Sequence, residues 1–596
     1  MDSRAALHQI FGFEQFRPGQ EAAVAAVSSD RDALVVMPTG AGKSLCYQLP
    51  ALMREDLTVV VSPLVSLMAD QVQALERVAP GRVALVNAQR GQSSNADAVQ
   101  RAVRGEVRIL YVAPERFAAP RFADALSAAR IGLFVVDEAH CVSQWGHDFR
   151  PDYFSLAAAA RGLGARATIA LTATATPRVA DDIARRLELR DPVRVTTGFD
   201  RPNLGFSVVP CKTAADKRGR IVAALSEAGA LPAIVYAGTR AATDQYADTL
   251  TRALGEEALA YHAGLDRGAR TTAQERFMSG GSRVIVATNA FGMGIDKADV
   301  RTVCHASVPG SLEAYYQEAG RAGRDGAPAR CMLFAEQRDK GLHVFFIQRA
   351  RVEDGEFERV SERLRWGGIR DDGRYNVELA ALGGVSSARA QKDDVRAIIG
   401  HLARSGLIAP EPSPPDRAAG RVIGEWNGRA LALCRGAARE AERARWSQYR
   451  AVWDYVERAA CRRAVLLAHF GDHSAPAPVV ACCDVCEGVC RERGAPEPVD
   501  RRVRPVHASG NDLERLDDAI VGVVSRARPP VGRTRAVEIL RGGRSKLIAA
   551  HAYDAMTAYG TFAHLRSAEV LGRVDQLLEA GTLRSTGGRF PKLQAA

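Results

Sequence analysis

Residues 35–44 read Val-Val-Met-Pro-Thr-Gly-Ala-Gly-Lys-Ser, and a helical pattern opens at Leu45. An apolar strand, a glycine-rich loop and a helix in this order form a cradle for phosphate groups. Glycines let backbone N–H groups approach the phosphates, Lys43 can reach the β and γ phosphates, and the Ser44 hydroxyl can bind Mg²⁺. Met37 stands where the pattern has its first glycine, so this motif alone leaves a chance match open. The predicted nucleotide-binding residues are Thr39, Gly40, Ala41, Gly42, Lys43 and Ser44.

A second apolar run ends in two carboxylates, in the sequence Ile131-Gly-Leu-Phe-Val-Val-Asp-Glu-Ala-His140. In phosphoryl transfer, one such carboxylate holds Mg²⁺ and another group orients the attacking water. We therefore predict that Asp137 binds Mg²⁺ together with Ser44 and that Glu138 orients the water. The simpler alternative is an exposed acidic pair at a strand end, and the cradle upstream argues against it.

Phosphoryl transfer also needs positive charge at the far side of the γ phosphate. The sequence Gln317-Glu-Ala-Gly-Arg-Ala-Gly-Arg-Asp-Gly326 supplies Arg321 and Arg324. An arginine delivered across a domain cleft contributes on the order of 10³–10⁵ in rate, so hydrolysis becomes sensitive to domain closure. Surface arginines in a glycine-rich loop are the alternative interpretation.

Short runs rich in Val and Ile alternate with amphipathic helical patterns from about residue 20 to 335. This alternation is typical of parallel sheets flanked by helices. The segment Gly198-Phe-Asp-Arg-Pro-Asn-Leu204 divides the stretch, so we predict an α/β fold with two tandem RecA-like P-loop domains, residues 1–205 and 206–345. The Arg-rich residues 350–440 are either an inserted winged-helix-like unit or a plain helical spacer.

The composition favours a globular protein with a polyanionic partner. The 596 residues are 47% hydrophobic and 25% charged, with a net charge of +11 and a pI near 9.2, which excludes a largely disordered chain and favours nucleic acid. No apolar run reaches the roughly 18 residues of a membrane span, and the first ten residues hold no apolar signal region. We expect a cytoplasmic protein, in the bacterial cytoplasm or nucleoid, without a membrane partner.

The motifs together resemble a known family. Asp137-Glu-Ala-His140, Thr172-Ala-Thr174 and the arginine motif resemble the second helicase superfamily, and residues 10–335 resemble its RecQ branch. The matching stretches are Phe11-Gly-Phe-Glu-Gln-Phe-Arg-Pro-Gly-Gln20, the cradle with Leu45-Cys-Tyr-Gln-Leu-Pro50, Ser62-Pro-Leu-Val-Ser-Leu67, residues 137–153, Ala287-Thr-Asn-Ala-Phe-Gly-Met-Gly-Ile-Asp296 and residues 317–326. The resemblance implies an ATP-dependent DNA helicase that moves 3′ to 5′ on single-stranded DNA and unwinds duplexes in repair and recombination.

Several roles are implied by this resemblance residue by residue. Phe13, Arg17 and Gln20 match the family motif that recognises adenine, which implies ATP; without the family, Phe13 would be interpreted as a core residue. His140 is implied to link the γ phosphate to the neighbouring domain. The predicted catalytic residues are then Lys43, Asp137, Glu138, His140, Arg321 and Arg324.

The loop that follows the acidic pair matches the family's aromatic-rich loop, which couples DNA contact to ATP hydrolysis. Its aromatic and basic side chains suit base stacking and phosphate contact, whereas buried packing is the alternative interpretation of the composition. His147 could equally be a histidine that packs within the loop. The residues implied in DNA coupling are Trp145, His147, Phe149 and Arg150.

Five of the 11 cysteines gather near residue 480 or upstream at Cys461, which lies on an expected helix from Trp446 to Phe470. In a cytosolic chain this clustering indicates a metal before a disulfide, and residues 441–495 resemble the RecQ zinc module, in which four thiolates hold Zn²⁺. Val480 stands where the family has its first clustered cysteine. Cys461, Cys483 and Cys486 are the expected ligands, the fourth is Cys482 or Cys490, and a degenerate, empty site is the alternative.

Residues 510–594 have a pattern of helices followed by a two-stranded wing, which resembles the RecQ carboxyl-terminal winged helix. Such a domain would hold duplex DNA through its phosphates. We expect the family's final helical DNA-binding domain to be absent. The expected partners are single-stranded, forked or duplex DNA, with a single-strand-binding protein as a further candidate, and we expect a monomer.

Three rival functions remain at this point: an RNA helicase, a translocase that remodels DNA-bound proteins without unwinding, and a non-catalytic DNA-binding scaffold. The aromatic loop and the zinc module favour DNA unwinding over the first two. The scaffold is disfavoured because a nucleotide-binding fold that had lost its activity would be expected to lack catalytic residues. Those residues are all present: Lys43, Ser44, Asp137, Glu138 and Arg324.

Overall fold

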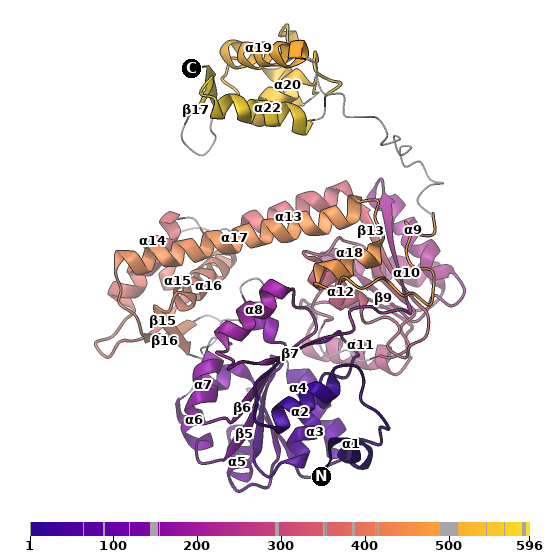
Figure 1. Ribbon diagram of the computed structural model, residues 1–596, viewed down its shortest axis with the longest axis vertical. Coiled ribbons are helices and arrows are strands. Elements are labelled where there is room, and N and C mark those ends of the chain that lie inside the picture. The colour runs from indigo at the N-terminus through magenta and orange to yellow at the C-terminus, as the bar shows by residue number, and fades with distance from the viewer. Residues whose placement is uncertain are drawn as a thin grey trace. The chain divides into compact units, whose positions relative to one another are not determined.

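The computed structural model describes residues 2–63, 65–87, 90–118, 120–143, 153, 155–292, 297–349, 352, 354–383, 388–411, 413, 417–488, 510–543, 545–565, 567–586 and 592–595. The chain divides into two compact units, Met1–Arg493 and Gly494–Ala596 (Figure 1). No described helix is both long and apolar enough to cross a membrane.

The larger unit begins with an α/β domain that we call lobe 1. It is built on a seven-stranded parallel sheet of order β3-β4-β2-β5-β6-β1-β7. Along β1, Leu34 and Val36 pack into one apolar core while Ala33 and Val35 pack into another. Both faces of the sheet are therefore covered, as a continuous apolar run predicts. The strands are β1 (Ala33–Val36), β2 (Leu57–Val61), β3 (Val83–Val86), β4 (Ile109–Val112), β5 (Ile131–Val136), β6 (Ala167–Thr172) and β7 (Val193–Thr196). The helices are α1 (Ser3–Phe11), α2 (Gln20–Ser28), α3 (Leu45–Met53), α4 (Val65–Glu76), α5 (Gln92–Val103), α6 (Pro120–Leu126), α7 (Leu156–Gly162) and α8 (Pro177–Arg186), with 3-10 turns η1 (Pro114–Ala118) and η2 (Ala139–Val142).

The strand order places the predicted motifs together. The phosphate cradle, residues 37–44, follows β1, and the acidic pair follows β5; β6 lies between these two strands. Because parallel strands end at the same edge of a sheet, the cradle, Thr172 at the end of β6 and the acidic pair share one crevice.

Lobe 2 is a second parallel sheet, of order β10-β11-β9-β12-β13-β8. Its strands are β8 (Leu204–Cys211), β9 (Ala233–Tyr236), β10 (Ala258–Tyr261), β11 (Val284–Ala287), β12 (Thr302–His305) and β13 (Ala329–Glu336). Its helices are α9 (Ala214–Ser226), α10 (Arg240–Leu254), α11 (Arg267–Met278), α12 (Leu312–Ala319) and α13 (Gln337–Arg349). The arginine loop, residues 317–326, runs from the end of α12 toward β13. The interlobe linker, residues 198–204, joins the two lobes.

An insert follows lobe 2 and has a core of its own, formed by side chains such as Phe357, Leu364, Ile398 and Leu402. Its elements are α14 (Asp354–Gly367), β14 (Arg374–Glu378), α15 (Leu379–Leu382), α16 (Ala388–Arg404), β15 (Ile408–Glu411) and β16 (Arg417–Val422), and its strands form an antiparallel sheet of order β14-β16-β15. A plain helical spacer would have neither the sheet nor the core, so that alternative is wrong. The order of helices and strands resembles a winged helix.

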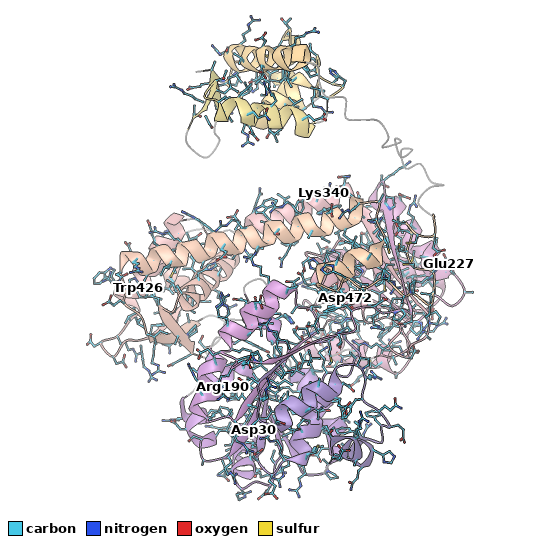
Figure 2. All side chains as sticks on the ribbon, in the orientation of Figure 1. Asp30, Arg190, Glu227, Lys340, Trp426 and Asp472 are labelled. Atoms are coloured by element: carbon cyan, nitrogen blue, oxygen red, sulfur yellow. The ribbon has the colours of Figure 1, made fainter. Side chains whose placement is uncertain are left out.

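The chain continues through α17 (Gly428–Glu457), α18 (Arg462–His469) and a loop to residue 488. This segment overlaps the predicted zinc-binding residues 441–495, and we refer to it as the zinc module. Figure 1 shows α17 running from the insert to lobe 2, and it packs on α16 and on α13. Lys340 on α13, labelled in Figure 2, forms an ion pair with Glu457 and lies 4.9 Å from the centre of the Trp453 ring. The sequence predicted one helix over residues 446–470. That prediction is wrong, because the chain leaves the helix after Glu457 and turns at Cys461.

The smaller unit packs α19 (Gly510–Arg526), α20 (Arg533–Leu540), α21 (Lys546–Ala550), the 3-10 turn η4 (Tyr553–Ala555) and α22 (Ser567–Glu579) around one apolar core. Two short antiparallel strands, β17 (Leu583–Ser585) and β18 (Leu593–Ala595), complete it. This is the predicted set of helices followed by a two-stranded wing.

Candidate active site and zinc site

The phosphate cradle has the backbone shape that a bound phosphate needs. Gly40 and Gly42 adopt φ angles of +84° and +81°, in the left-handed region that favours glycine. A Cβ added at Gly42 would lie 2.6 Å from Nε2 of Gln20, so a larger residue would fill the loop. The Lys43 ammonium donates to the carbonyl oxygens of Met37 (3.1 Å) and Pro38 (3.3 Å), inside the same loop. The cradle residues therefore fit a nucleotide phosphate chain.

The segment preceding α2 is attached to the outer side of the cradle. Gln20 donates through Nε2 to the carbonyl oxygens of Ala41 (3.1 Å) and Gly42 (3.0 Å), and Arg17 donates to the carbonyl oxygen of Gly40 (2.6 Å). Phe13 is 53% exposed, so the interpretation of Phe13 as a core residue is wrong. The exposed Phe13 ring lies parallel to the Phe11 ring, with centroids 6.4 Å apart.

The acidic pair follows β5, with Glu138 buried and Asp137 half-buried. Burial raises the pKa of the Asp137 carboxyl to about 7, the Glu138 carboxylate adds to the rise, and Lys43 opposes it. A cation at this place would favour the ionised carboxylate. Glu138 has a φ of +47°, which is strained for a residue with a side chain, and such strain gathers at functional sites. The residues therefore suit a divalent cation.

His140 is fully buried behind the acidic pair. Its Nδ1 lies 2.9 Å from the Thr172 hydroxyl and 3.3 Å from Oε2 of Glu138. Both contacts are within lobe 1, so His140 joins the acidic pair to the end of β6. The link of His140 to lobe 2 that the resemblance implied stays a prediction.

Lobe 2 brings its arginine loop to the cradle. A Cβ added at Gly40 would lie 3.7 Å from Cγ of Arg324. Burial lowers the pKa of Lys43; Glu138 and Asp137 oppose this change, and the positive charge of Arg324 adds to it. Arg321 is only 4% exposed. Lobe 2 thus places the Arg324 side chain against the phosphate cradle of lobe 1.

The DNA-coupling residues Trp145, His147, Phe149 and Arg150 lie outside the described residues. The flanks of their loop are described. The Tyr153 hydroxyl donates to the carbonyl oxygen of Asp137 (3.0 Å), and the Ser143 hydroxyl donates to Asp182 (2.8 Å). The flank at Tyr153 is therefore hydrogen-bonded to the backbone of the acidic pair.

Four cysteines meet beside the interlobe linker. The sulfur atoms of Cys461, Cys482, Cys483 and Cys486 all lie within 4.8 Å of one another. The backbone N–H groups of Arg462 and Cys486 both donate to Sγ of Cys483 at 3.4 Å. Four thiols at this spacing match the donor set of a structural zinc site. Cys490 lies outside the described residues, and the described cysteines already supply four donors.

Four family models match the chain: DEAD/DEAH box helicase at residues 17–183, helicase conserved C-terminal domain at 216–326, RecQ zinc-binding at 428–487 and RQC domain at 511–596. ATP-dependent DNA helicase RecQ of Bacillus subtilis is 31% identical over 598 aligned residues, which cover 99% of this chain and 82% of that protein. The chain belongs to the RecQ family. The RecQ helicase of Pasteurella multocida is 41% identical over 356 residues, 59% of this chain and 55% of that one.

Among solved structures, helicase Lhr of Mycobacterium smegmatis bound to single-stranded DNA and a nucleotide analogue is similar with a TM-score of 0.47, at 21% identity, over 74% of this chain and 61% of that one. The RecQ matches confirm the predicted fold class: two RecA-like domains, a zinc-binding module and a winged helix. The protein is an ATP-dependent DNA helicase, and it uses ATP, Mg²⁺ and Zn²⁺.

Proposed function

We propose that this RecQ helicase converts ATP hydrolysis into 3′ to 5′ movement along single-stranded DNA and thereby separates duplex strands during repair and recombination. The observation that carries the proposal is the approach of Arg324 of lobe 2 to Gly40 of lobe 1. A cation delivered across the cleft makes hydrolysis depend on lobe closure, and cycles of closure are what a motor needs. The polarity and the cellular role rest on the resemblance of residues 10–335 to RecQ.

Each residue at the cleft has a proposed part in ATP hydrolysis. Residues 39–44 bind the phosphates, with Lys43 at the β and γ groups, while Phe13, Arg17 and Gln20 hold the adenine. Ser44 and Asp137 would hold Mg²⁺, which when bound neutralises charge on the β and γ phosphates. Glu138 orients the attacking water, and His140 links the γ phosphate to lobe 2. Arg321 and Arg324 stabilise charge on the transferring phosphate.

The other modules have proposed parts in holding DNA. Cys461, Cys482, Cys483 and Cys486 would bind Zn²⁺, which when bound cross-links the zinc module. Residues 510–594 contact duplex phosphates, and Trp145, His147, Phe149 and Arg150 report DNA contact to the acidic pair. Association with a single-strand-binding protein, a monomeric state and a cytoplasmic location stay predictions from the sequence.

Strand separation tests this proposal directly. Three substrates are compared with ATP and Mg²⁺: a DNA duplex with a 3′ tail, one with a 5′ tail, and an RNA duplex. We expect separation of the 3′-tailed DNA, and we expect Lys43→Ala and Glu138→Gln each to nearly abolish both ATP turnover and unwinding. Preference for the 5′ tail would contradict the polarity, and DNA-stimulated turnover without separation of any duplex would indicate a translocase.

A further inference from the structure

The interlobe linker carries an arginine that no sequence motif singled out. The Arg201 guanidinium donates four hydrogen bonds, and every acceptor is a backbone carbonyl oxygen. The acceptors are Thr39 (3.3 Å), Gly320 (3.2 Å), Ala322 (3.0 Å) and Gly323 (3.0 Å). Thr39 belongs to the phosphate cradle of lobe 1, whereas the other three belong to the arginine loop of lobe 2. One side chain therefore bridges the two halves of the candidate active site.

The acceptors on lobe 2 lie at the peptide units that carry the two predicted catalytic arginines. Gly320 precedes Arg321, and Ala322 and Gly323 lie between Arg321 and Arg324. Holding these carbonyl groups fixes the orientation of the backbone from which both arginine side chains project. Among the ion pairs of the described residues none includes Arg201, so its contacts serve the backbone of the loop and not a neighbouring carboxylate.

A second linker residue supports the same loop. Asn203 donates through Nδ2 to the carbonyl oxygens of Gly323 (2.8 Å) and Ala327 (2.9 Å). A Cβ added at Gly323, whose φ is +55°, would lie 2.4 Å from that Nδ2. The loop therefore packs on the linker so closely that only glycine fits at this point.

The zinc module holds the linker from the other side. Arg463, which is 1% exposed, donates to Oδ1 of Asp200 (2.5 Å) and to the carbonyl oxygen of Arg201 (2.7 Å). The Phe470 ring stacks on Phe199 with centroids 4.7 Å apart. With the Asp200 carboxylate and the Arg201 carbonyl both held by Arg463, the linker presents the Arg201 side chain at a defined place.

We propose that Arg201 is a positioning residue for ATP hydrolysis. It spans from the Thr39 carbonyl to the arginine loop and so sets the distance and orientation at which Arg321 and Arg324 meet the phosphate held by the cradle. This inference rests on the proposed role of the arginine loop. The charge and the planar fork of arginine are both required, because a single ammonium group cannot reach four carbonyl oxygens spread over two lobes.

Steady-state ATP hydrolysis with saturating single-stranded DNA tests the proposal on the full chain. We expect Arg201→Lys to lower kcat by roughly 10- to 100-fold, the cost of a displacement near 1 Å at a reacting centre, while KM for ATP changes less than about two-fold, because the lost interaction acts on the transition state. The matched control is Arg330→Lys. Arg330 donates to the carbonyl oxygen of Ala224 (3.0 Å) and pairs with Glu227, labelled in Figure 2, wholly within lobe 2. We expect this control to keep the wild-type kcat.

A double-variant cycle separates positioning from general damage. If Arg201 acts through the arginine loop, adding Arg201→Lys to a background that lacks both loop arginines, Arg321→Ala with Arg324→Ala, lowers kcat no further than that background alone. Losses that add, an unchanged kcat in Arg201→Lys, or a raised KM at constant kcat would each overturn the proposal. Thermal melting and binding of a fluorescent ATP analogue confirm that the variants are folded. If Arg201→Lys is not folded, Arg201→Gln replaces it in every comparison. Full turnover in Lys43→Ala would instead overturn the proposed function itself.

Discussion

A buried ion pair next to the thiol cluster offers a test of how the zinc module is built. Arg462 donates to both carboxylate oxygens of Asp484 at 3.0 Å, and the two side chains are 6% and 4% exposed. Arg462 follows Cys461, and Asp484 follows Cys483, so each partner is bonded to a predicted zinc ligand. The change to make is Arg462→Met, which keeps the apolar volume and removes the charge.

The expected size of the effect follows from burial. Removing one partner of a buried ion pair costs about 3–5 kcal/mol, because the remaining charge is left in a poor solvent. If the pair formed only when zinc is bound, the whole cost would appear in zinc affinity, about 10²- to 10⁴-fold at about 1.36 kcal/mol per decade. Arg462 is also held by the carbonyl oxygen of Arg458 (2.8 Å), so part of the arrangement survives without the metal. We therefore expect a loss of about 10- to 100-fold, the usual range for groups that orient metal ligands.

Competition for zinc against a chromogenic chelator measures this loss. Asp484→Leu should also weaken zinc binding. The double variant Arg462→Met with Asp484→Leu should lose less zinc affinity than the two single variants lose together, because neither charge is then left buried without its partner. Arg330→Lys, on lobe 2, serves as the control with wild-type affinity. Zinc affinity of Arg462→Met within about two-fold of wild type would refute the argument, and so would a double variant that shows the full sum of both losses.

Two further predictions concern the same module. Cys482→Ser should lower the zinc content of the purified protein, measured by atomic absorption, while Cys490→Ser should retain one zinc per chain; the reverse result would make Cys490 the fourth ligand. Burial raises the pKa of Glu313, but the hydrogen bond from His469 (2.9 Å) and its charge outweigh burial and hold that pKa below its ordinary value. The pair therefore stabilises the contact of α12 with α18 above about pH 4 and loses this effect as the pH falls through the lowered pKa. The melting temperature of His469→Gln should lie below that of wild type at pH 6, and the difference should shrink in acid; a difference independent of pH would contradict this.

The part of the site that could be predicted from the sequence consists of residues whose role depends on the residues next to them in the chain. The cradle, the acidic pair and the strands that carry them follow from apolar runs that end in glycines or carboxylates. The contacts of Arg201 and Arg463 could not be predicted, since Arg463 meets Asp200 across 263 residues of sequence and only the docking of α18 brings them together. The break before Cys461 was missed because residues 446–470 favour a helix throughout. Spacing alone also left Cys482 and Cys490 equivalent, whereas the structure places the Cys482 sulfur within 4.8 Å of the other three described thiols of the cluster.

The thiol-bearing loop of the zinc module forms a single parallel bridge to the edge of the lobe 2 sheet. Strand β8 lies at the edge of the lobe 2 sheet, where unpaired backbone groups invite wrong pairing. The backbone N–H of Phe206 donates to the carbonyl oxygen of Cys482 (3.2 Å), and the N–H of Asp484 donates to the carbonyl oxygen of Phe206 (3.1 Å). The thiol-bearing loop thus pairs with β8 in parallel at Phe206 and Cys483. Strand β8 starts where the interlobe linker ends. The loop that carries the thiols therefore also helps to fix the position at which the linker meets the sheet. This position in turn determines the place from which Arg201 reaches the cradle.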